Sequence, residues 1–265
     1  MKKDNLGDRM KCYESVSKNR LINKIPVIIR LDGKAFHTFT RGFDKPFDEI
    51  IERAMRQTTL ELCKKIQGCV LGYTQSDEIT LVLCDYQKTE TAAWYDYEVQ
   101  KMTSVSASIA TLAFDRALND IWLEMYESND ITMRDSMELI NKKRGMGAFF
   151  DSRAFNVPEN EVVNCLIWRQ QDATRNSIQA LAQSLYSHKE LQGVGCNKLQ
   201  DKMFTEKGVN WNNLTTYQKR GAAVIKVPQT IEKNGEQIIR NAWIVDNEMP
   251  IISKCREYVN SRIIF

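Results

Sequence analysis

The fold is decided by one stretch, Ile25-Pro26-Val27-Ile28-Ile29-Arg30-Leu31-Asp32-Gly33. Its short, continuous apolar run predicts a buried strand, and the acid followed by glycine predicts that the strand ends in a tight turn. The sequence therefore places a carboxylate, that of Asp32, at the exit of a buried strand.

The region after this strand predicts a helix and then a hairpin. Apolar residues recur at helical spacing from about residue 46 to residue 67, and this apolar face is expected to cover a sheet. Two β-like runs follow at 69–73 and 79–84, joined by Thr74-Gln75-Ser76-Asp77-Glu78. The order is β-α-β-β, which predicts an α+β fold.

The remainder of the chain alternates helical and extended patterns. A long amphipathic helix is predicted from about residue 99 to residue 125, and a strand at 148–157. Pro158 fits the start of a helix that runs through Trp168, and a separate helical pattern spans about 174–186. A strand is predicted at 222–227, followed by a terminal hairpin with its turn at Asn234-Gly235.

Composition excludes several classes of protein. The chain has 265 residues, and its 37 basic against 34 acidic side chains leave a net charge of +3, so any contact with RNA must use local patches. No run approaches the roughly 20 apolar residues of a membrane span, and the first residues lack a signal-peptide core, so we expect a cytoplasmic protein with no membrane partner. Seven cysteines without a C-x-x-C pair, and two histidines, do not predict a structural zinc site.

Asp32 and the pair Asp77-Glu78 are the candidate chemical groups. The β-α-β-β order can bring acids from neighbouring strands to one edge of the sheet, and Mg²⁺ is commonly held by one or two carboxylates together with substrate phosphates. On spacing alone, solvated turn carboxylates are the better interpretation.

Three ordered motifs favour a metal site over solvated turn carboxylates: 30–39 (RLDGKAFHTF), 43–48 (FDKPFD) and 72–78 (GYTQSDE). Together they closely resemble the tRNA(His) guanylyltransferase family and its 3′→5′ polymerase relatives, and looser likeness extends the match over roughly residues 6 to 228. The resemblance implies a polymerase- or cyclase-like palm, an antiparallel sheet with helices on one face, followed by a C-terminal helical and hairpin extension. The implied segments are a palm core with the nucleotide and metal site (1–150), the rest of the catalytic domain with the tRNA-contacting region (151–228), and a hairpin extension without an assigned role (229–265).

The resemblance also implies the site. Asp32 and Asp77 would hold two Mg²⁺ ions, with Glu78 beside them and the Gly33 carbonyl assisting. ATP would adenylylate a 5′-monophosphate, and the 3′-hydroxyl of GTP or another nucleoside triphosphate would then attack the activated 5′ end. The residues expected to bind the nucleotide through backbone N–H groups or side chains are Gly33, Lys34, Ala35, Phe36, His37, Lys45 and Ser76.

Contacts with tRNA are expected from a scattered set of mostly basic side chains. The candidates are Lys142, Lys143, Arg144, Asp151, Arg153, Arg169, Asn176, Lys198 and Lys219. Structural alternatives stand beside several of them: the basic run at 142–144 also fits a solvated loop, and Asp151 with Arg153 also fits a structural ion pair. His37 and Lys45 have similar alternatives, as a satisfied histidine and a solvated loop lysine, and Trp168 is expected in the core.

One motif departs from the family pattern. Eukaryotic members that recognise tRNA(His) carry a His-Ile-Asn-Asn motif, whereas this chain has Thr174-Arg175-Asn176-Ser177. The departure favours template-dependent repair of 5′-truncated tRNA over the addition of a single guanosine to tRNA(His), which stays the alternative. A tRNA-binding protein without catalysis is a third hypothesis. The family resemblance further implies a homotetramer built as a dimer of dimers.

Overall fold

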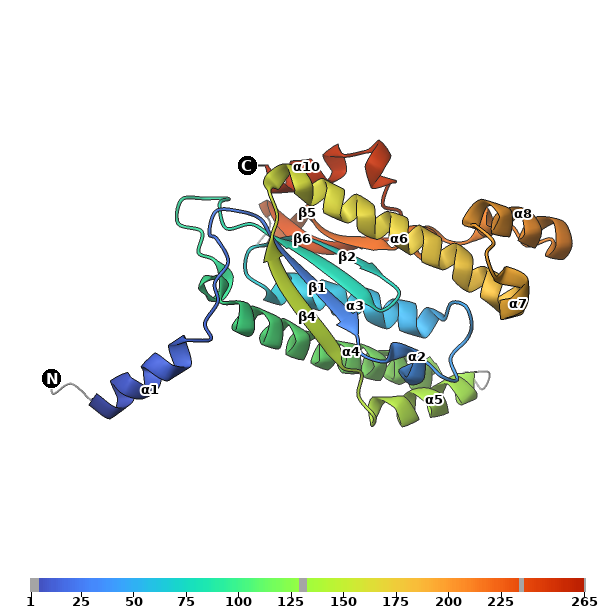
Figure 1. Ribbon diagram of the computed structural model, residues 1–265, viewed down its shortest axis with the longest axis horizontal. Coiled ribbons are helices and arrows are strands. Elements are labelled where there is room, and N and C mark those ends of the chain that lie inside the picture. The colour runs from blue at the N-terminus through green and yellow to red at the C-terminus, as the bar shows by residue number, and fades with distance from the viewer. Residues whose placement is uncertain (1–4, 129–132, 234–235, 265) are drawn as a thin grey trace.

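The computed structural model describes residues 5–128, 133–233 and 236–264. Its centre is one six-stranded antiparallel sheet in the order β4-β1-β3-β2-β5-β6 (Figure 1). The strands are β1 (Val27–Gly33), β2 (Cys69–Gln75), β3 (Glu78–Leu83), β4 (Phe150–Asn156), β5 (Ala222–Lys233) and β6 (Glu236–Asp246). The α-helices are α1 (Asn5–Ser15), α2 (Phe36–Phe39), α3 (Glu49–Lys65), α4 (Val99–Ser128), α5 (Arg134–Arg144), α6 (Glu159–Leu185), α7 (His188–Leu191), α8 (Cys196–Lys207), α9 (Thr216–Arg220) and α10 (Glu257–Ile263). Shorter 3-10 helices span Trp94–Tyr97, Trp211–Asn213 and Ile252–Lys254.

The predicted α+β fold and its β-α-β-β order are confirmed. Strand β1, helix α3 and strands β2 and β3 follow one another, with the single-turn helix α2 inserted after β1. The Asp48 carboxylate begins α3 by accepting the N–H groups of Ile50 and Ile51, at 2.9 and 3.2 Å. The predicted long helix is α4, and the predicted strand around residue 150 is β4.

Helices cover both faces of the sheet, so the prediction of helices on one face was wrong. On one face, Val27, Ile29 and Leu31 pack in a cluster with residues of α3 and α4. On the other face, Ile28 packs with Val162 and other residues of α6 and α10. The continuous apolar run of β1 explains this arrangement, because a strand without apolar-polar alternation is buried on both of its faces.

Helix α6 also differs from its prediction, because the two helices expected at 158–168 and 174–186 form one continuous helix. No glycine or proline interrupts the residues between them, so nothing in the sequence ends the first helix. The C-terminal half of α6 carries a separate apolar cluster, in which Ile178 and Leu181 pack with Leu199 and Met203 of α8.

The predicted terminal hairpin is present as β5 and β6, and its proposed turn at Asn234-Gly235 lies outside the described residues. Strand β5 pairs with β2 at its start, and residue 229 falls inside β5. All three segments expected from the sequence therefore contribute strands to a single sheet. At the other end of the chain, α1 extends away from the sheet and has no buried residue (Figure 1). Among the described helices, none has the length and apolar character needed to cross a bilayer.

Candidate active site

Strand β1 begins with apolar residues and ends with charged ones, and the candidate site lies at its charged end. Ile28 faces α6, and because side chains alternate along a strand, Arg30 and Asp32 face the same way. Asp32 lies opposite Glu78 of β3 on one side and opposite Asp151 of β4 on the other. Like charges directly opposite one another destabilise a sheet, so this row of three carboxylates points to a functional role.

Asp77 joins this row from the turn between β2 and β3. The Gly33 N–H donates to the Asp77 carbonyl at 3.1 Å, which ties the end of β1 to that turn. The Ser76 hydroxyl donates to Asp77 Oδ1 at 3.1 Å. Burial raises the pKa of Asp77 to about 6, and the charge of Asp32 adds to this effect. The structure thus brings Asp32 and Asp77 together at one end of the sheet.

The chemistry of the carboxylates fits a divalent cation. Burial raises the pKa of Asp32, and the charges of Glu78 and Asp151 raise it further, which reports a local surplus of negative charge. Among the described residues, no three histidine, cysteine or acidic side chains form a complete metal-binding group. Two carboxylates are nevertheless a normal protein contribution to Mg²⁺, which keeps waters and takes further oxygens from substrate phosphates.

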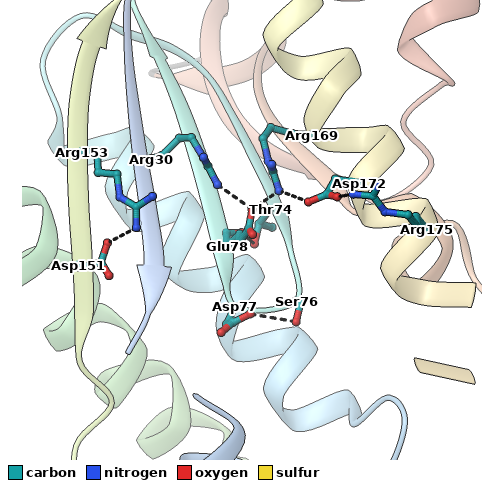
Figure 2. A network of polar contacts seen from close by, with 10 residues as sticks. All are labelled: Arg30, Thr74, Ser76, Asp77, Glu78, Asp151, Arg153, Arg169, Asp172 and Arg175. Carbon is teal, nitrogen blue, oxygen red and sulfur yellow. Dashed lines mark hydrogen bonds and ion pairs between the residues drawn. The ribbon is translucent and has the colours of Figure 1, made fainter. Parts of the chain in front are cut away.

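Glu78 sits in an ion-pair network that the sequence did not predict. Its Oε2 accepts from Arg169 at 2.6 Å and from Arg30 at 3.3 Å (Figure 2). Arg169 is only 5% exposed and also donates to Asp172 at 2.8 Å, and Asp172 in turn pairs with Arg175. Two guanidinium groups therefore form ion pairs with Glu78.

The turn after β1 has a tightly defined shape. A Cβ atom on Gly33 would lie 2.3 Å from Cδ2 of Phe36, so only glycine fits there. The Lys34 N–H donates to the Phe149 carbonyl at 2.8 Å, and Ala35 has a positive φ of 52°. The N–H groups of Gly33 and Lys34 are thus hydrogen-bonded to carbonyls. In the described structure, the N–H groups of the predicted nucleotide-binding turn that lack a partner are those of residues 35–37.

A pocket of about 570 Å³ opens beside this turn and contains the remaining predicted nucleotide contacts. Gly33, Ala35 and Phe36 line it, together with the exposed side chains of His37 and Lys45. The lining also includes residues of three helices that the sequence did not single out: Glu52 of α3, Ser177, Ala180 and Gln183 of α6, and Tyr217 and Gln218 of α9. The predicted Asn176 lines the pocket too, as do Ser76, Asp77 and Glu78.

The basic run at the end of α5 is mostly turned inward. Lys143 is buried, and its Nζ donates to the Thr38 carbonyl at 3.4 Å. Arg144 donates to Asn119 at 2.7 Å, and its guanidinium lies over the Trp122 ring. Both side chains therefore have structural partners, and Lys142 is the exposed member of the run.

The other candidates for RNA contact fall into two groups. Arg169 is buried in the ion-pair network, and Lys219 Nζ donates to the Asn212 carbonyl at 2.8 Å. Lys198 is exposed on α8, and Arg153 and Asp151 are exposed and lie 3.3 Å apart, the ion pair weighed as an alternative. The prediction that Trp168 belongs to the core was wrong: it is 50% exposed, with the guanidinium groups of Arg30 and Arg169 near its ring.

Asp172 and Arg175 were missed by sequence reasoning, and so was the connection between Arg169 and Glu78. The spacing of Arg169, Asp172 and Arg175 is the one signal the sequence offered, since residues three apart are neighbours on a helix. The Arg169–Glu78 pair joins residues 91 positions apart, and no local pattern predicts it.

Comparison with known proteins identifies the family of this chain. The family model for tRNAHis guanylyltransferase (Thg1) matches residues 7–158. Uncharacterized protein R259 of Acanthamoeba polyphaga mimivirus is 30% identical over 231 residues, which cover 83% of this chain and 77% of that protein. A bacterial tRNA(His) guanylyltransferase (Thg1)-like protein has been solved in complex with ATP, at 41% identity and a TM-score of 0.81, covering 98% of this chain and 100% of the other. A bacterial tRNA(His) guanylyltransferase (Thg1)-like protein in complex with GTP gives 39% identity and a TM-score of 0.79, covering 99% of this chain and 100% of the other. The chain therefore belongs to the tRNAHis guanylyltransferase (Thg1) family.

Proposed function

We propose that this protein is a metal-dependent nucleotidyltransferase that adds nucleotides to the 5′ end of tRNA, in the 3′→5′ direction and under the direction of a template strand. The observation that carries the proposal is the meeting of Asp32 and Asp77 beside a pocket lined by the 33–37 turn, in a chain of this family. In this proposal the β-α-β-β core acts as a polymerase-like palm.

Asp32 and Asp77 would hold a pair of Mg²⁺ ions, and the Gly33 carbonyl would assist. The oxygen-only donor set and the surplus of negative charge support this assignment. When bound, the ions would stabilise the charge that develops on the attacking and leaving oxygens of an in-line displacement. Ser76 would orient the Asp77 carboxylate through its hydroxyl group.

The triphosphate would lie in the pocket along the 35–37 turn. Backbone N–H groups without partners in the described structure favour an anion at that turn, and the exposed side chains of His37 and Lys45 would add contacts. The bacterial Thg1-like structures in complex with ATP and with GTP support nucleoside triphosphates as substrates here.

The reaction would have two displacements. A 5′-monophosphate oxygen of the RNA attacks the α-phosphorus of ATP and releases pyrophosphate, which leaves the 5′ end adenylylated. The 3′-hydroxyl oxygen of the incoming nucleotide then attacks the activated 5′ phosphorus and releases AMP. The protein's part is to position the groups and to neutralise charge, so no nucleophilic side chain is required.

The exposed side chains Lys142, Arg153 and Lys198 stay candidates for tRNA contact, because exposed cations are available to phosphates. Asn176, which remains from the family's His-Ile-Asn-Asn motif, lines the nucleotide pocket. We also propose a homotetramer on the family resemblance, and light scattering coupled to gel filtration measures its mass directly.

The stretch Thr174-Arg175-Asn176-Ser177 favours repair of truncated tRNA over single-guanosine addition to tRNA(His). The test supplies 5′-truncated, monophosphorylated tRNAs with ATP, Mg²⁺ and all four nucleotides. We expect the addition of bases complementary to the opposite strand. A strong preference for full-length tRNA(His) would replace repair by guanosine addition, and absence of product with every tRNA would contradict both.

A tRNA-binding protein without catalysis is the remaining hypothesis. Asp77→Ala separates it from the enzymatic proposals, because chemistry needs the carboxylate and binding of tRNA does not. Loss of 5′ addition with retained tRNA binding supports an enzyme. An Asp77→Ala protein that performs every function of the wild type contradicts it.

A further inference from the structure

Arg169 is a buried charged residue that the proposed chemistry does not use. It lies in α6, is 5% exposed, and donates to Glu78 at 2.6 Å and to Asp172 at 2.8 Å. Figure 2 shows it between these two carboxylates, with Arg30 reaching Glu78 from β1. A guanidinium buried this deeply needs several partners, and here the partners lie on two separate elements of the fold, β3 and α6 itself.

Burial of an ion pair is a poor source of stability, because the loss of hydration offsets most of the attraction between the charges. One turn earlier, Leu166 packs the same helix onto the same sheet face with no charge at all. The cost of placing an arginine at residue 169 therefore points to a role that an apolar side chain does not fulfil. That role concerns Glu78, which follows Asp77 directly in the chain.

Glu78 is held at its backbone as well as at its side chain. The Thr74 hydroxyl donates to the Glu78 carbonyl at 3.1 Å, and Glu78 pairs in register with both Asp32 and Gln75. A displacement of Glu78 therefore displaces the turn that carries Asp77 and shifts its distance from Asp32. The Arg169 guanidinium, which belongs to α6 and not to the sheet, holds Glu78 by its side chain.

We propose that Arg169 is a positioning residue for the active site: it fixes Glu78, and through it the Asp77 turn, in the arrangement that binds a metal–triphosphate complex. Arg169 touches neither the nucleotide nor the reacting atoms. The same contact fixes α6 against β3, and α6 carries Asn176 and Ser177 into the wall of the nucleotide pocket. The inference rests on the proposed function, because it takes Asp32 and Asp77 to be the metal ligands.

The first experiment compares wild type with Arg169→Gln, Arg169→Lys and Arg53→Gln. Arg53→Gln is the matched control, since Arg53 pairs with Glu124 on the opposite side of the sheet, in an exposed contact between α3 and α4. Calorimetry measures the affinity for ATP in the presence and absence of Mg²⁺, and steady-state assays separate kcat from KM for the RNA.

We expect Arg169→Gln to weaken Mg²⁺-dependent ATP binding and to lower kcat, each by about 10- to 100-fold, as is typical when a group that orients metal ligands is removed. The KM for the RNA should be unchanged, and the ATP affinity without Mg²⁺ should fall much less than the affinity with Mg²⁺, because only the α6 wall of the pocket is then affected. Lysine should restore part of the loss, because it keeps the charge but not the two-pronged geometry. A folded Arg169→Gln protein with wild-type Mg²⁺-dependent binding and kcat overturns the inference.

A double-mutant cycle shows whether Arg169 acts through Glu78. Glu78→Gln removes the charge that Arg169 holds, so the double variant should lose no more than the more damaged single variant. If the losses of the two single variants multiply in the double variant, Arg169 does not act through Glu78. A melting curve shows whether Arg169→Gln folds. If it does not fold, Asp172→Asn removes the other partner of Arg169 and is expected to give a smaller loss of Mg²⁺-dependent ATP binding and of kcat. An Asp172→Asn protein with wild-type values for both then counts against the inference.

Failure of the proposed function gives a different result. If the wild type adds no nucleotide to any RNA, the repair proposal fails, whereas the calorimetric comparison still tests Arg169. If the wild type is active and Arg169→Gln binds Mg²⁺ and ATP as the wild type does, the repair proposal stands and the inference about Arg169 fails.

Discussion

Helix α6 contacts one face of the sheet in two different ways. Near its start, Val162 and Leu166 pack with Ile28 and Val82 in a fully buried apolar cluster. One turn later, Arg169 replaces this packing with an ion pair to Glu78. The difference teaches that the interface between this helix and this sheet face has an apolar end, which serves stability, and an end beside the Asp77 turn, which we propose serves chemistry, so substitutions at the two ends should separate the two properties.

The largest expected effect is at the chemical end. Asp77→Asn removes a charge proposed to hold Mg²⁺, and since metal stabilisation of the transition state contributes several kcal/mol, kcat should fall on the order of 10³-fold. Stability at pH 7 should not fall. The folded pKa of Asp77, about 6, is above the ordinary aspartate value of 3.8, so its ionised form disfavours the folded state above that range, and asparagine removes this penalty.

Single-turnover assays and melting curves at pH 7, recorded without metal, check both expectations. Glu124→Gln, in the exposed pair with Arg53, is the control and should leave kcat unchanged. An Asp77→Asn protein that unfolds earlier and keeps its activity would invert the comparison between the two ends of this interface.

The apolar end should show the opposite pattern. Leu166→Ala leaves a cavity between α6 and the sheet and should lower the free energy of unfolding by about 2 to 5 kcal/mol. The fraction that stays folded should keep the wild-type kcat, because the ion pair and the pocket are unaltered. Urea denaturation gives the first quantity, and active-site titration with steady-state kinetics gives the second. A large loss of kcat in the folded fraction would show that the two ends are coupled.

Gly33→Ala should affect stability and binding together. Its new Cβ would lie 2.3 Å from the Phe36 ring, which is held by Phe39, Phe114 and Phe150. Overpacking of this kind costs about 1 to 3 kcal/mol, and the displaced turn should bind ATP more weakly. Denaturation and nucleotide titration measure the two changes, and an unaffected ATP affinity would remove the 33–37 turn from the proposed binding site.

The smallest effect is expected beside the apolar cluster that the C-terminal half of α6 shares with α8. Ser177 is buried, and its Oγ accepts the Trp211 indole N–H at 3.0 Å. Ser177→Ala leaves that donor without its acceptor and should lower the free energy of unfolding by about 1 kcal/mol. Tryptophan fluorescence during urea denaturation follows the change, and a variant as stable as the wild type would mean that water replaces the lost acceptor.

The sequence predicted the parts of this molecule that depend on local pattern. The buried strand that ends at Asp32, the hairpin that carries Asp77 and the long helix α4 all follow from runs and periods of apolar residues. The β-α-β-β order allows the two aspartates to converge, and the family resemblance favoured a site there over solvated turn carboxylates. Helices on both sheet faces were also implied by the unalternating run at 27–29, a signal that the single-face prediction overlooked.

Long-range contacts were beyond these patterns. Lys143 and Arg144 look like a solvated basic run, yet their partners Thr38, Asn119 and Trp122 lie on other elements. Trp168 was expected in the core from its sequence, yet its side chain is half exposed. Its ring lies beside the Arg30 guanidinium and not in an apolar cluster. Both outcomes depend on how α5 and α6 are placed, which only tertiary packing determines.

The two hydrogen bonds at the start of the 33–37 turn have a kinetic consequence. Because the Gly33 and Lys34 N–H groups are already paired with carbonyls of two other segments, the turn has its final shape before any ligand arrives. Little conformational entropy is then lost on association, and nucleotide should enter in a single diffusion-controlled phase without a slower closing step.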